Sequence, residues 1–546
     1  MLKKTPDIIL IQPPVEDYYF TFKRSIPYGL ACIAAALEKH GFSVEIIDSL
    51  AVNKSKRVNP PKEFSYLEKY YGRNDVSPFS LFHYFRHYGY SFEHIGKLVR
   101  DKNPFLIGIS SLFTPYGNEA LRTAAAVKKF LPKCRIVMGG HHPTVLYKKV
   151  MASKHVDFLL RGEGEVSMPV LADALKNRTE LEKVPGIVFR KEDGSLYIDK
   201  PVWIKDFTLY PLPDMDLVNY KFYKRKNKGC TTVVTARGCP MKCTYCSVGA
   251  SSVCAEFRTR SVKSVMDELK PQMAKYDIGF IDFEDENLTL NRHWFLSLIK
   301  EFEKVFKGHK IELRAMNGLF PPSLDETIIA AMKKAGFKAL NLSLGSTSKS
   351  QLKAFKRPDI RKAFEKALVL AEKYAIKTVS YIIAGAPGQT ACQSVKDLLF
   401  LAERRTLAGL SIFYPAPGSL DYNVCKEKGL LPEHYSLMRS TAFPISDTTS
   451  ELEASTLLRL ARITNFMKFI IDGNEDLPKP TPFDKTCIID VKNRTKSGKK
   501  LLSWFLHDGI IRGVMPDGRT FKHLTEKKLS KQFIHGLDKI IVRGVL

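Results

Sequence analysis

The sequence predicts an α/β protein with two successive layers of parallel strands, in which each strand is followed by a helix. Short apolar runs alternate with helical patterns through the first third of the chain, and the same alternation begins again at Thr232. A stretch rich in proline and charge, residues 185–229, separates the two regions. With 546 residues, of which 44% are hydrophobic, the chain is long enough for two or three domains with buried cores.

The first region is expected to form an open, doubly wound sheet of the Rossmann or flavodoxin type. Strands are expected at 7–12, 42–47, 105–110, 135–138 and 156–160, and helices at 27–40, 118–131, 144–152 and from 165 to 175. This predicts a domain over residues 1–195, in which 54–90 is an aromatic and charged insertion expected to pack over the mouth of the site. Ordinary packing of its aromatic side chains is the alternative. In such a sheet, ligands lie at the carboxyl ends of the strands.

The second region is expected to form a partial (β/α)6 barrel over residues 231–420, after a linker at 196–230. Strands are expected at 232–235, 278–283, 310–314, 339–343, 377–383 and 409–413, and helices at 262–275, 292–306, 324–335, 360–374 and 392–404. Chemistry in a barrel of this kind collects at the carboxyl ends of the strands. A small carboxyl-terminal domain, 421–546, is expected to follow, with a long helix at 451–471.

Net charge and hydropathy limit the expected cellular location of the protein and the classes of partner it could bind. The formal net charge is +28, from 85 Lys and Arg against 57 Asp and Glu. Such a surface could attract nucleic acid, a membrane surface or an anionic substrate, or could simply be solvated, and no nucleic-acid-binding module accompanies it. No apolar run approaches the roughly 20 residues of a membrane span, and the run at 8–11 is too short for a signal sequence. We expect a cytoplasmic protein with reduced thiols and no transmembrane segment.

Three cysteines, Cys239, Cys243 and Cys246, follow the first strand of the second region. Their CxxxCxxC spacing puts three thiols on one loop, and Gly238 and Pro240 keep that loop out of helix and strand. Three thiolates suit an iron–sulfur cluster that leaves one iron open.

The sequence gives less support to a structural zinc site or a disulfide at these thiols. A structural zinc site needs four ligands, and no histidine lies between residues 201 and 290. Cys230 or Cys254 could supply a fourth thiol, but neither forms a second tight pair with another cysteine. A disulfide would leave one thiol over.

The triplet, with Tyr245 before its last cysteine, resembles the signature of the radical S-adenosylmethionine (SAM) superfamily. The resemblance implies a [4Fe-4S] cluster on the three cysteines, with SAM bound to the open iron through its amino and carboxylate groups, and Tyr245 is expected among the cofactor-binding residues. An electron from the cluster then splits SAM to give a 5′-deoxyadenosyl radical. A reductant such as flavodoxin or ferredoxin is implied.

The ends of two strands in the first region resemble a cobalamin-binding domain. These are Ser110-Ser111-Leu112 and, one strand further, Gly139-Gly140. A hydroxyl there can bind the nucleotide tail of cobalamin, and glycines let the chain pass close to it. The DxHxxG loop of that family is missing, because residues 12–17 contain no histidine. A histidine ligand to cobalt from that loop is therefore not supported. Because each of the two motifs is weak alone, a flavodoxin-like domain with another ligand, or none, stays open.

Gly162 and Glu163, in the segment Arg161-Gly-Glu-Gly-Glu165, resemble the group of radical SAM enzymes that also bind cobalamin. The adjacent His141 and His142 are expected to be solvated or to touch the tail rather than to bind metal.

Resemblance to the radical SAM family also assigns contacts with SAM. We expect them from Arg258 and Arg260 (carboxylate), Glu284 and Asp285 (methionine amino group), Ser343 (ribose), and Gly385, Pro387 and Gly388 (adenosine). The ribose contact is the weakest, because Gly345 stands where relatives commonly carry a glutamate. Helix capping and surface ion pairs are the alternatives for the acidic and basic groups.

The two resemblances together predict a cobalamin-dependent radical C-methyltransferase, similar to class B radical SAM methyltransferases. An unactivated carbon offers no nucleophile, so hydrogen must be removed before methylcobalamin can deliver a methyl group. The layout is also similar to the anaerobic Mg-protoporphyrin monomethyl ester oxidative cyclases, so a cobalamin-assisted cyclisation or radical rearrangement is the alternative. A non-catalytic, zinc-containing protein that binds nucleic acid or membrane is the alternative of another class. The sequence indicates no substrate, and no catalytic residue beyond the cluster ligands.

Overall fold

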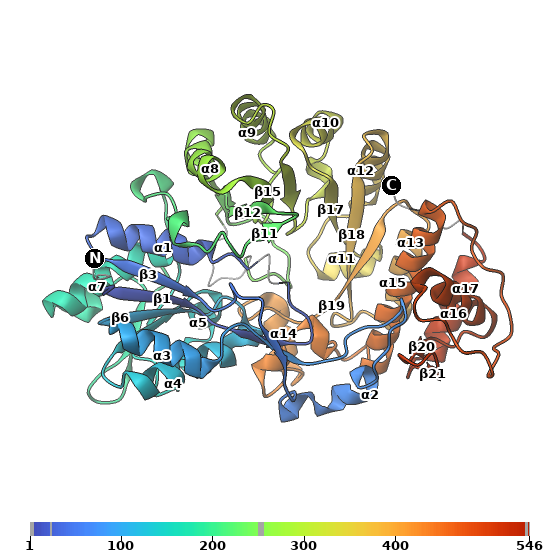
Figure 1. The fold of residues 1–546 in the computed structure, drawn as a ribbon, viewed down its shortest axis with the longest axis horizontal. Coiled ribbons are helices and arrows are strands. Elements are labelled where there is room, and N and C mark those ends of the chain that lie inside the picture. Colours follow the sequence, from blue (N-terminus) through green and yellow to red (C-terminus); the bar gives the residue numbers. More distant parts are fainter. Residues whose placement is uncertain (1–4, 22–24, 249–255, 541–543, 545–546) are drawn as a thin grey trace.

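Residues 5–21, 25–248, 256–540 and 544 are described by the computed structural model. The amino-terminal sheet forms one side of the molecule, the arc of the second sheet system forms the other, and carboxyl-terminal helices flank the arc (Figure 1). Both predicted sheet regions are therefore present, in the predicted order.

The amino-terminal sheet has seven strands in the order β10-β9-β8-β7-β6-β1-β3. They are β1 Ile8–Gln12, β3 Val44–Asp48, β6 Leu106–Ser110, β7 Arg135–Gly139, β8 Phe158–Leu160, β9 Ile187–Arg190 and β10 Leu196–Ile198. The first five in chain order are parallel, and they give the flavodoxin-like order 2-1-3-4-5 with a switch point between β1 and β6. The expectation of a purely parallel sheet is incomplete, because β9 and β10 extend the edge antiparallel.

Helices cover both faces of this sheet. They are α1 Tyr28–Lys39, α3 Phe92–Lys102, α4 Gly117–Phe130, α5 His141–Val145, α6 Tyr147–Met151 and α7 Gly164–Asn177. Alternate residues of β1 point to opposite faces: Ile8 packs in the cluster with α1 and α7, and Ile9 in the cluster with α3, α4 and α6. The helix expected at 144–152 is in fact two short helices, which turn at Leu146.

The second sheet system supplies the six strands of the partial barrel. The strands are β12 Lys228–Val233, β15 Ile278–Phe283, β16 Glu312–Ala315, β17 Ala339–Gly345, β18 Lys377–Ala384 and β19 Leu407–Ile412, with β11 Lys224–Arg225 at the edge. Between them run α8 Val262–Tyr276, α9 Arg292–Val305, α10 Glu326–Ala335, α11 Lys349–Ala354, α12 Arg361–Lys373 and α13 Ala391–Ala402. Two sheets result, β11-β12-β15-β16 and β17-β18-β19, and the parallel bridge Leu319↔Leu342 joins them.

Two further groups of elements complete the chain. The insertion contains β4 Ser55–Arg57, the 3-10 helix η2 Lys62–Leu67, α2 Glu68–Tyr71 and β5 Arg86–Tyr88, and it pairs with β2 Val15–Asp17. The carboxyl-terminal part contains α14 Leu420–Glu427, α15 Glu451–Asp472, α16 Arg494–Asp508, β20 Arg512–Val514, β21 Thr520–Lys522 and α17 Lys527–Leu537. The long helix predicted at 451–471 is confirmed as α15.

The insertion, which belongs to the amino-terminal part of the chain, contacts the carboxyl-terminal part. Tyr66 and Tyr71 donate hydrogen bonds to the carbonyls of Ala442 (2.6 Å) and Thr441 (2.9 Å). Its aromatic side chains share one hydrophobic core with the barrel and α15, including the fully buried Tyr71. The insertion therefore closes the side of the molecule where the carboxyl-terminal helices dock.

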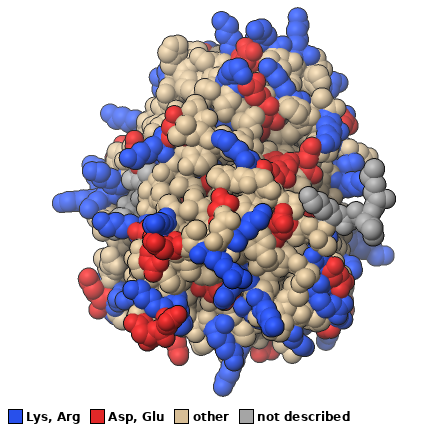
Figure 2. All heavy atoms as spheres, turned by 90° about the vertical axis from the view of Figure 1, so that its left-hand side faces the viewer, with Lys and Arg blue, Asp and Glu red and all other residues tan. Residues whose placement is uncertain are grey.

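The charge is spread over the surface. On the face that Figure 2 shows, Lys and Arg side chains are distributed over the whole view and alternate with Asp and Glu. This distribution agrees with a solvated surface on that face. Among the described helices, none combines the length and the apolar character needed to cross a bilayer.

A buried polar group fastens the insertion to the hairpin of β20 and β21. Asp75, 2% exposed, accepts a hydrogen bond from the backbone N–H of Val514 (3.0 Å), and its other oxygen lies 2.8 Å from His523 Nε2. The guanidinium of Arg459 lies 4.0 Å from the same carboxylate and donates to the carbonyls of Phe79 and Tyr70. Burial lowers the pKa of His523 to about 4, so the charge pair at neutral pH is Asp75 with Arg459.

We expect Asp75→Ala to lower the free energy of unfolding by about 3–5 kcal/mol, because it leaves a buried guanidinium without its carboxylate. Chemical denaturation followed by circular dichroism measures this. Asp517→Ala, which removes a carboxylate from the exposed turn between β20 and β21, is the matched control and should leave stability nearly unchanged. Equal stability of the two variants would contradict the role of Asp75.

Candidate active site between the two sheets

The carboxyl ends of the two sheet systems meet through buried ion pairs. After β8, Glu163 lies 3.0 Å from Arg258 and 3.3 Å from Arg237, and Glu165 lies 2.6 Å from Arg237. Both arginines belong to the short antiparallel pair β13 Ala236–Arg237 and β14 Arg258–Thr259, which borders the cysteine loop. The four side chains are between 7% and 24% exposed, so the two sheets are held together by charges shielded from water.

Backbone hydrogen bonds fix the start of the cysteine loop. The carboxylate of Asp285, which follows β15, accepts hydrogen bonds from the Thr235 hydroxyl (2.6 Å) and from the N–H groups of Thr235 (3.0 Å) and Ala236 (2.5 Å). Its position therefore determines where the chain leaves β12 and where Cys239 begins its loop. Burial raises the pKa of Asp285 to about 7.

The far end of the loop is held from the opposite side of the barrel. Thr244 exchanges hydrogen bonds with Asp421 at the start of α14: its hydroxyl donates to the carboxylate (3.1 Å), and its carbonyl accepts from the Asp421 N–H (2.9 Å). Arg357 donates to the Tyr245 hydroxyl (2.7 Å) and to the carbonyl of Ser343 at the end of β17 (3.0 Å). Tyr245 is thus a positioning residue for the loop.

All three thiols are half-buried and free of disulfide bonds. Burial raises the pKa of Cys239, and a hydrogen bond from Asn287 opposes that shift. The positive charge of Arg357 lies close enough to Cys243 and Cys239 for both to influence its pKa. Thiolates beside a fixed guanidinium are suited to soft metal ligation.

Within the described residues, no three His, Cys, Asp or Glu side chains converge closely enough to hold a single metal ion. Three separate thiols on one irregular loop match an iron–sulfur cluster, because each thiol binds a different iron. Of the alternative fourth ligands, Cys230 is buried within β12 and Cys254 lies outside the described residues.

The three acidic residues after β15, Glu284, Asp285 and Glu286, differ in their contacts and exposure. Asp285 is occupied by the backbone of the cysteine loop, and the Glu284 N–H donates to Val233 in the strand next door (3.1 Å). Glu286 is exposed and lies near Arg237 and Cys239. Burial raises the pKa of Cys239, and the charge of Glu286 adds to that shift, whereas the charge of Arg237 opposes the raised pKa of Glu286. The sequence assigned Glu284 and Asp285 to SAM; in the structure one oxygen of Asp285 holds the backbone, Glu284 is half-buried and Glu286 is the most exposed of the three. Nothing in the sequence distinguishes the three.

Both arginines assigned to the SAM carboxylate have protein partners in this structure. Arg258 is paired with Glu163 and also donates to the carbonyl of Ile204. Arg260 pairs with Glu268 (2.5 Å) and donates to the Tyr28 hydroxyl (3.1 Å). These contacts favour a structural role for both, in ion pairs that are buried and not on the surface as the alternative above supposed.

The remaining SAM positions lie at the carboxyl ends of β17 and β18. Ser343 accepts a hydrogen bond from Arg357 (3.2 Å), a residue that no sequence motif marked. Gly388, with φ +78°, has open space where a side chain would lie, whereas a Cβ on Gly385 would come within 2.8 Å of Pro444. Gly388 therefore remains the position where a ligand could approach the backbone, next to Pro387 in the same turn.

The predicted cobalamin loops lie together at the switch point of the first sheet. Ser110 ends β6 opposite Gly139 at the end of β7, and the Ser111 N–H donates to the carbonyl of Gly139 (2.8 Å). Gly140 has φ +111°, and a Cβ there would lie 2.7 Å from the Ser111 carbonyl oxygen, so only glycine fits. Glycine at position 140 therefore allows the two loops to pack this closely.

Unsatisfied groups at these loops match a large, partly apolar ligand. The buried hydroxyl of Ser111 and the Nε2 atoms of His141 and His142 lack hydrogen-bond partners. Leu112 and Phe113, immediately after β6, are 54% and 59% exposed. A bound corrin would cover the apolar side chains, and polar groups of its tail could pair with the buried atoms.

Gly162 and Glu163 have structural tasks in this structure. Gly162 pairs with Val202, and a Cβ there would lie 2.0 Å from the Val202 carbonyl oxygen. Besides its arginine contacts, Glu163 accepts a hydrogen bond from the Ile204 N–H (2.5 Å). Their assignment to cobalamin therefore has no support in these contacts.

Comparison with known families agrees with this arrangement. The family model of the Radical SAM superfamily matches residues 233–401, and the B12 binding domain model matches residues 81–172. The first implies a [4Fe-4S] cluster and SAM, and the second implies cobalamin. These are the cofactors that the sequence predicted.

Two curated relatives and one solved structure illustrate the similarity. The chain is 26% identical over 478 residues to an uncharacterized methyltransferase of Pyrococcus horikoshii, covering 85% of this chain and 93% of the relative. It is 26% identical over 308 residues to the anaerobic magnesium-protoporphyrin IX monomethyl ester cyclase of Cereibacter sphaeroides, covering 55% of this chain and 49% of the relative. The fold is similar to that of the radical SAM methyltransferase TsrM from Kitasatospora setae, solved with cobalamin and a [4Fe-4S] cluster, at a TM-score of 0.56 and 16% identity, covering 77% of this chain and 78% of that chain.

Two domain matches, a cysteine loop with three free thiols and paired loops at a flavodoxin-like switch point converge on one conclusion. The chain contains a radical SAM domain and a B12-binding domain, and it is homologous to cobalamin-dependent radical SAM methyltransferases and to the magnesium-protoporphyrin IX monomethyl ester cyclases.

Proposed function

We propose that this enzyme transfers a methyl group to an unactivated carbon of its substrate. The proposal is supported most directly by the positions of the two sets of loops. The cysteine loop and the paired loops after β6 and β7 belong to two sheets that buried ion pairs join at their carboxyl ends. When bound, the cluster with SAM supplies hydrogen removal from carbon, and cobalamin supplies the methyl group.

The protein's own residues hold and shield the reacting groups. Cys239, Cys243 and Cys246 would hold the cluster, and Tyr245 keeps their loop in place through Arg357. The loops from Ser110 to Leu112 and at Gly139-Gly140 would hold cobalamin. The ion pairs of Glu163 and Glu165 with Arg258 and Arg237 border the cysteine loop and neutralise the charges on this side of the site.

Within this proposal, Glu286 binds the amino group of SAM. It is the most exposed carboxylate of the segment after β15 and lies near Cys239. A carboxylate stabilises a neighbouring ammonium group by a charge-assisted hydrogen bond. The exposed backbone at Gly388 and the hydroxyl of Ser343 remain proposed contacts for the nucleoside part.

Radical SAM enzymes need a reductant, and we propose a small acidic electron carrier, such as flavodoxin or ferredoxin, in the cytoplasm. Complementary charge favours this partner, because the enzyme carries a net charge of +28 with Lys and Arg spread over the visible face (Figure 2). The same charge supports an anionic substrate or contact with a membrane surface.

Cyclisation is the second candidate, because the similarity to the cyclase of Cereibacter sphaeroides extends over 308 residues. The same proposed site could remove hydrogen without delivering a methyl group. The domain matches favour either enzyme over a non-catalytic zinc protein.

The function is tested by anaerobic reconstitution with iron, sulfide, cobalamin and SAM carrying a labelled methyl group, followed by a search for labelled product in extracts of the host. We expect label in a new carbon–methyl bond. SAM cleavage and a mass loss in the product without transferred label would instead indicate cyclisation, and no cleavage at all would contradict both.

Cys243→Ala is expected to abolish SAM cleavage, because it removes one thiolate ligand of the cluster. Iron and sulfide analysis with the visible absorbance of the reconstituted protein should report the lost or altered cluster. Cys487→Ala replaces another half-buried free thiol and should leave cleavage unchanged. Full cleavage by the Cys243→Ala protein would remove the assignment.

Glu286→Gln is expected to weaken SAM binding by about tenfold, because a charge-assisted hydrogen bond becomes a neutral one. Equilibrium dialysis with labelled SAM on the reconstituted protein measures the dissociation constant. Glu433→Gln, at an exposed position outside the site, is the control. An unchanged dissociation constant in Glu286→Gln would exclude this carboxylate from the SAM site.

A further inference from the structure

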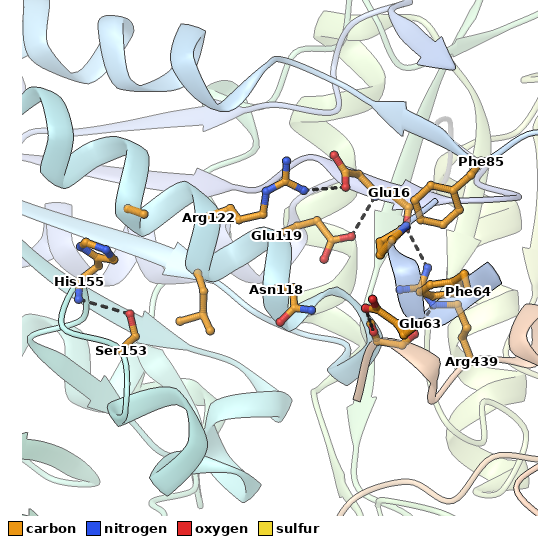
Figure 3. Close-up of a pocket in the computed structure, with 14 residues that line it drawn as sticks. Glu16, Glu63, Phe64, Phe85, Asn118, Glu119, Arg122, Ser153, His155 and Arg439 are labelled. Carbon is orange, nitrogen blue, oxygen red and sulfur yellow. Dashed lines mark hydrogen bonds and ion pairs between the residues drawn. The ribbon is translucent and has the colours of Figure 1, made fainter. Parts of the chain in front are cut away.

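A pocket of about 410 Å³ lies on helix α4, and neither the cysteine loop nor the loops after β6 and β7 contribute to its lining. Its walls come from α4, the turn after α6, the insertion and the segment around Ser436 and Arg439 (Figure 3). None of the thiols, the predicted SAM contacts or the predicted cobalamin contacts lines it. Its volume is within the range of small-molecule sites.

One polar atom in this pocket has no partner. Glu119 is 4% exposed, its Oε1 accepts a hydrogen bond from the Glu16 N–H (3.2 Å), and its Oε2 is buried without any hydrogen bond. Figure 3 shows the side chain extending from α4 into the space between Asn118 and Glu16. An unsatisfied buried oxygen costs free energy that a ligand with a hydrogen-bond donor would recover.

The other charged groups nearby are already engaged. Glu16 accepts from Arg122 (2.6 Å) and lies 2.9 Å from His87 Nδ1. Arg439 pairs with Asp17 (3.0 Å) and donates to backbone carbonyls. The two guanidinium groups of the pocket are therefore neutralised by carboxylates.

What remains is an acidic pocket with apolar walls. Glu63 accepts a hydrogen bond from the neutral hydroxyl of Ser436 (2.9 Å), and neither Glu63 nor Glu119 forms an ion pair with another pocket residue. The charge of Arg439 acts on Glu119 only from a distance, and its lowering effect on the pKa of that carboxyl is smaller than the raising effect of burial. Phe64, Phe85 and Leu121 line the same space. In a chain of net charge +28, two such carboxyl groups beside aromatic rings select against anions and favour a cation with an apolar body.

We propose that this pocket is a second ligand site, which binds a small organic ammonium ion through Glu119, with the apolar body of the ion against Phe64 and Leu121. Burial raises the pKa of Glu119 to about 7, and an ammonium ion at Oε2 would favour the charged carboxylate. The site is separate from the proposed methyl-transfer site, so its occupancy can be measured without turnover.

Three probes with the same aromatic body test the proposal by isothermal titration of the full, reconstituted chain: 2-phenylethylammonium, 2-phenylethanol and 3-phenylpropionate. We expect the ammonium ion to bind, and the alcohol and the carboxylate to bind at least about tenfold more weakly. Glu119→Gln should weaken binding of the ammonium ion by about tenfold or more, while its side-chain carbonyl can still accept from the Glu16 N–H.

Two further variants keep the test decisive. Ala125→Trp fills the pocket from the half-exposed surface of α4 and should prevent binding even where Glu119→Gln does not fold. Glu180→Gln, on an exposed carboxylate outside the pocket, should leave binding unchanged. Equal binding of all three probes, binding of the ammonium ion that survives both pocket variants, or no binding of any probe would each overturn the proposal.

Discussion

The arrangement of this molecule depends on two glutamates and two arginines that meet between its sheets. Buried charges are tolerated only when they are paired, because desolvating an unpaired carboxylate or guanidinium is costly. Glu163 and Glu165 follow a strand of the first sheet, whereas Arg237 and Arg258 flank the cysteine loop of the second. Satisfying these four charges brings the carboxyl ends of both sheets together, and with them the two sets of loops that can hold cofactors.

A second set of buried polar contacts joins the carboxyl-terminal part of the chain to the first domain and to the insertion. Arg439, in the carboxyl-terminal part, pairs with Asp17 and donates to the carbonyls of Glu16 and Pro115 in the first domain. Asp75 of the insertion is fastened to the hairpin of β20 and β21. The insertion and the carboxyl-terminal helices therefore share one core with the barrel, and neither is an independent appendage.

Neighbouring carboxyl groups in this protein differ in how far they are paired and how far they are exposed. One oxygen of Asp285 accepts from two backbone N–H groups and a hydroxyl while its other oxygen is buried without a partner, whereas the neighbouring Glu286 is exposed. Glu119 keeps one buried oxygen without a partner, although Glu16 beside it is fully engaged. Accessibility and pairing, rather than residue type, distinguish groups available to ligands from groups that hold the fold.

The sequence by itself determined the features that depend on near neighbours in the chain. The alternation of strands and helices, the cysteine spacing and the glycine at 140 follow from local sterics and periodicity, and the structure has all three. Only the tertiary structure decided the partners of the arginines, the accessible carboxylate at Glu286, the antiparallel edge of the first sheet and the docking of the insertion. These depend on residues far apart in the chain, such as Arg258 and Glu163, separated by 95 positions, or Asp75 and His523, separated by 448. No local pattern encodes such a meeting, because it is the packing of whole sheets and helices that brings the two partners within hydrogen-bonding distance.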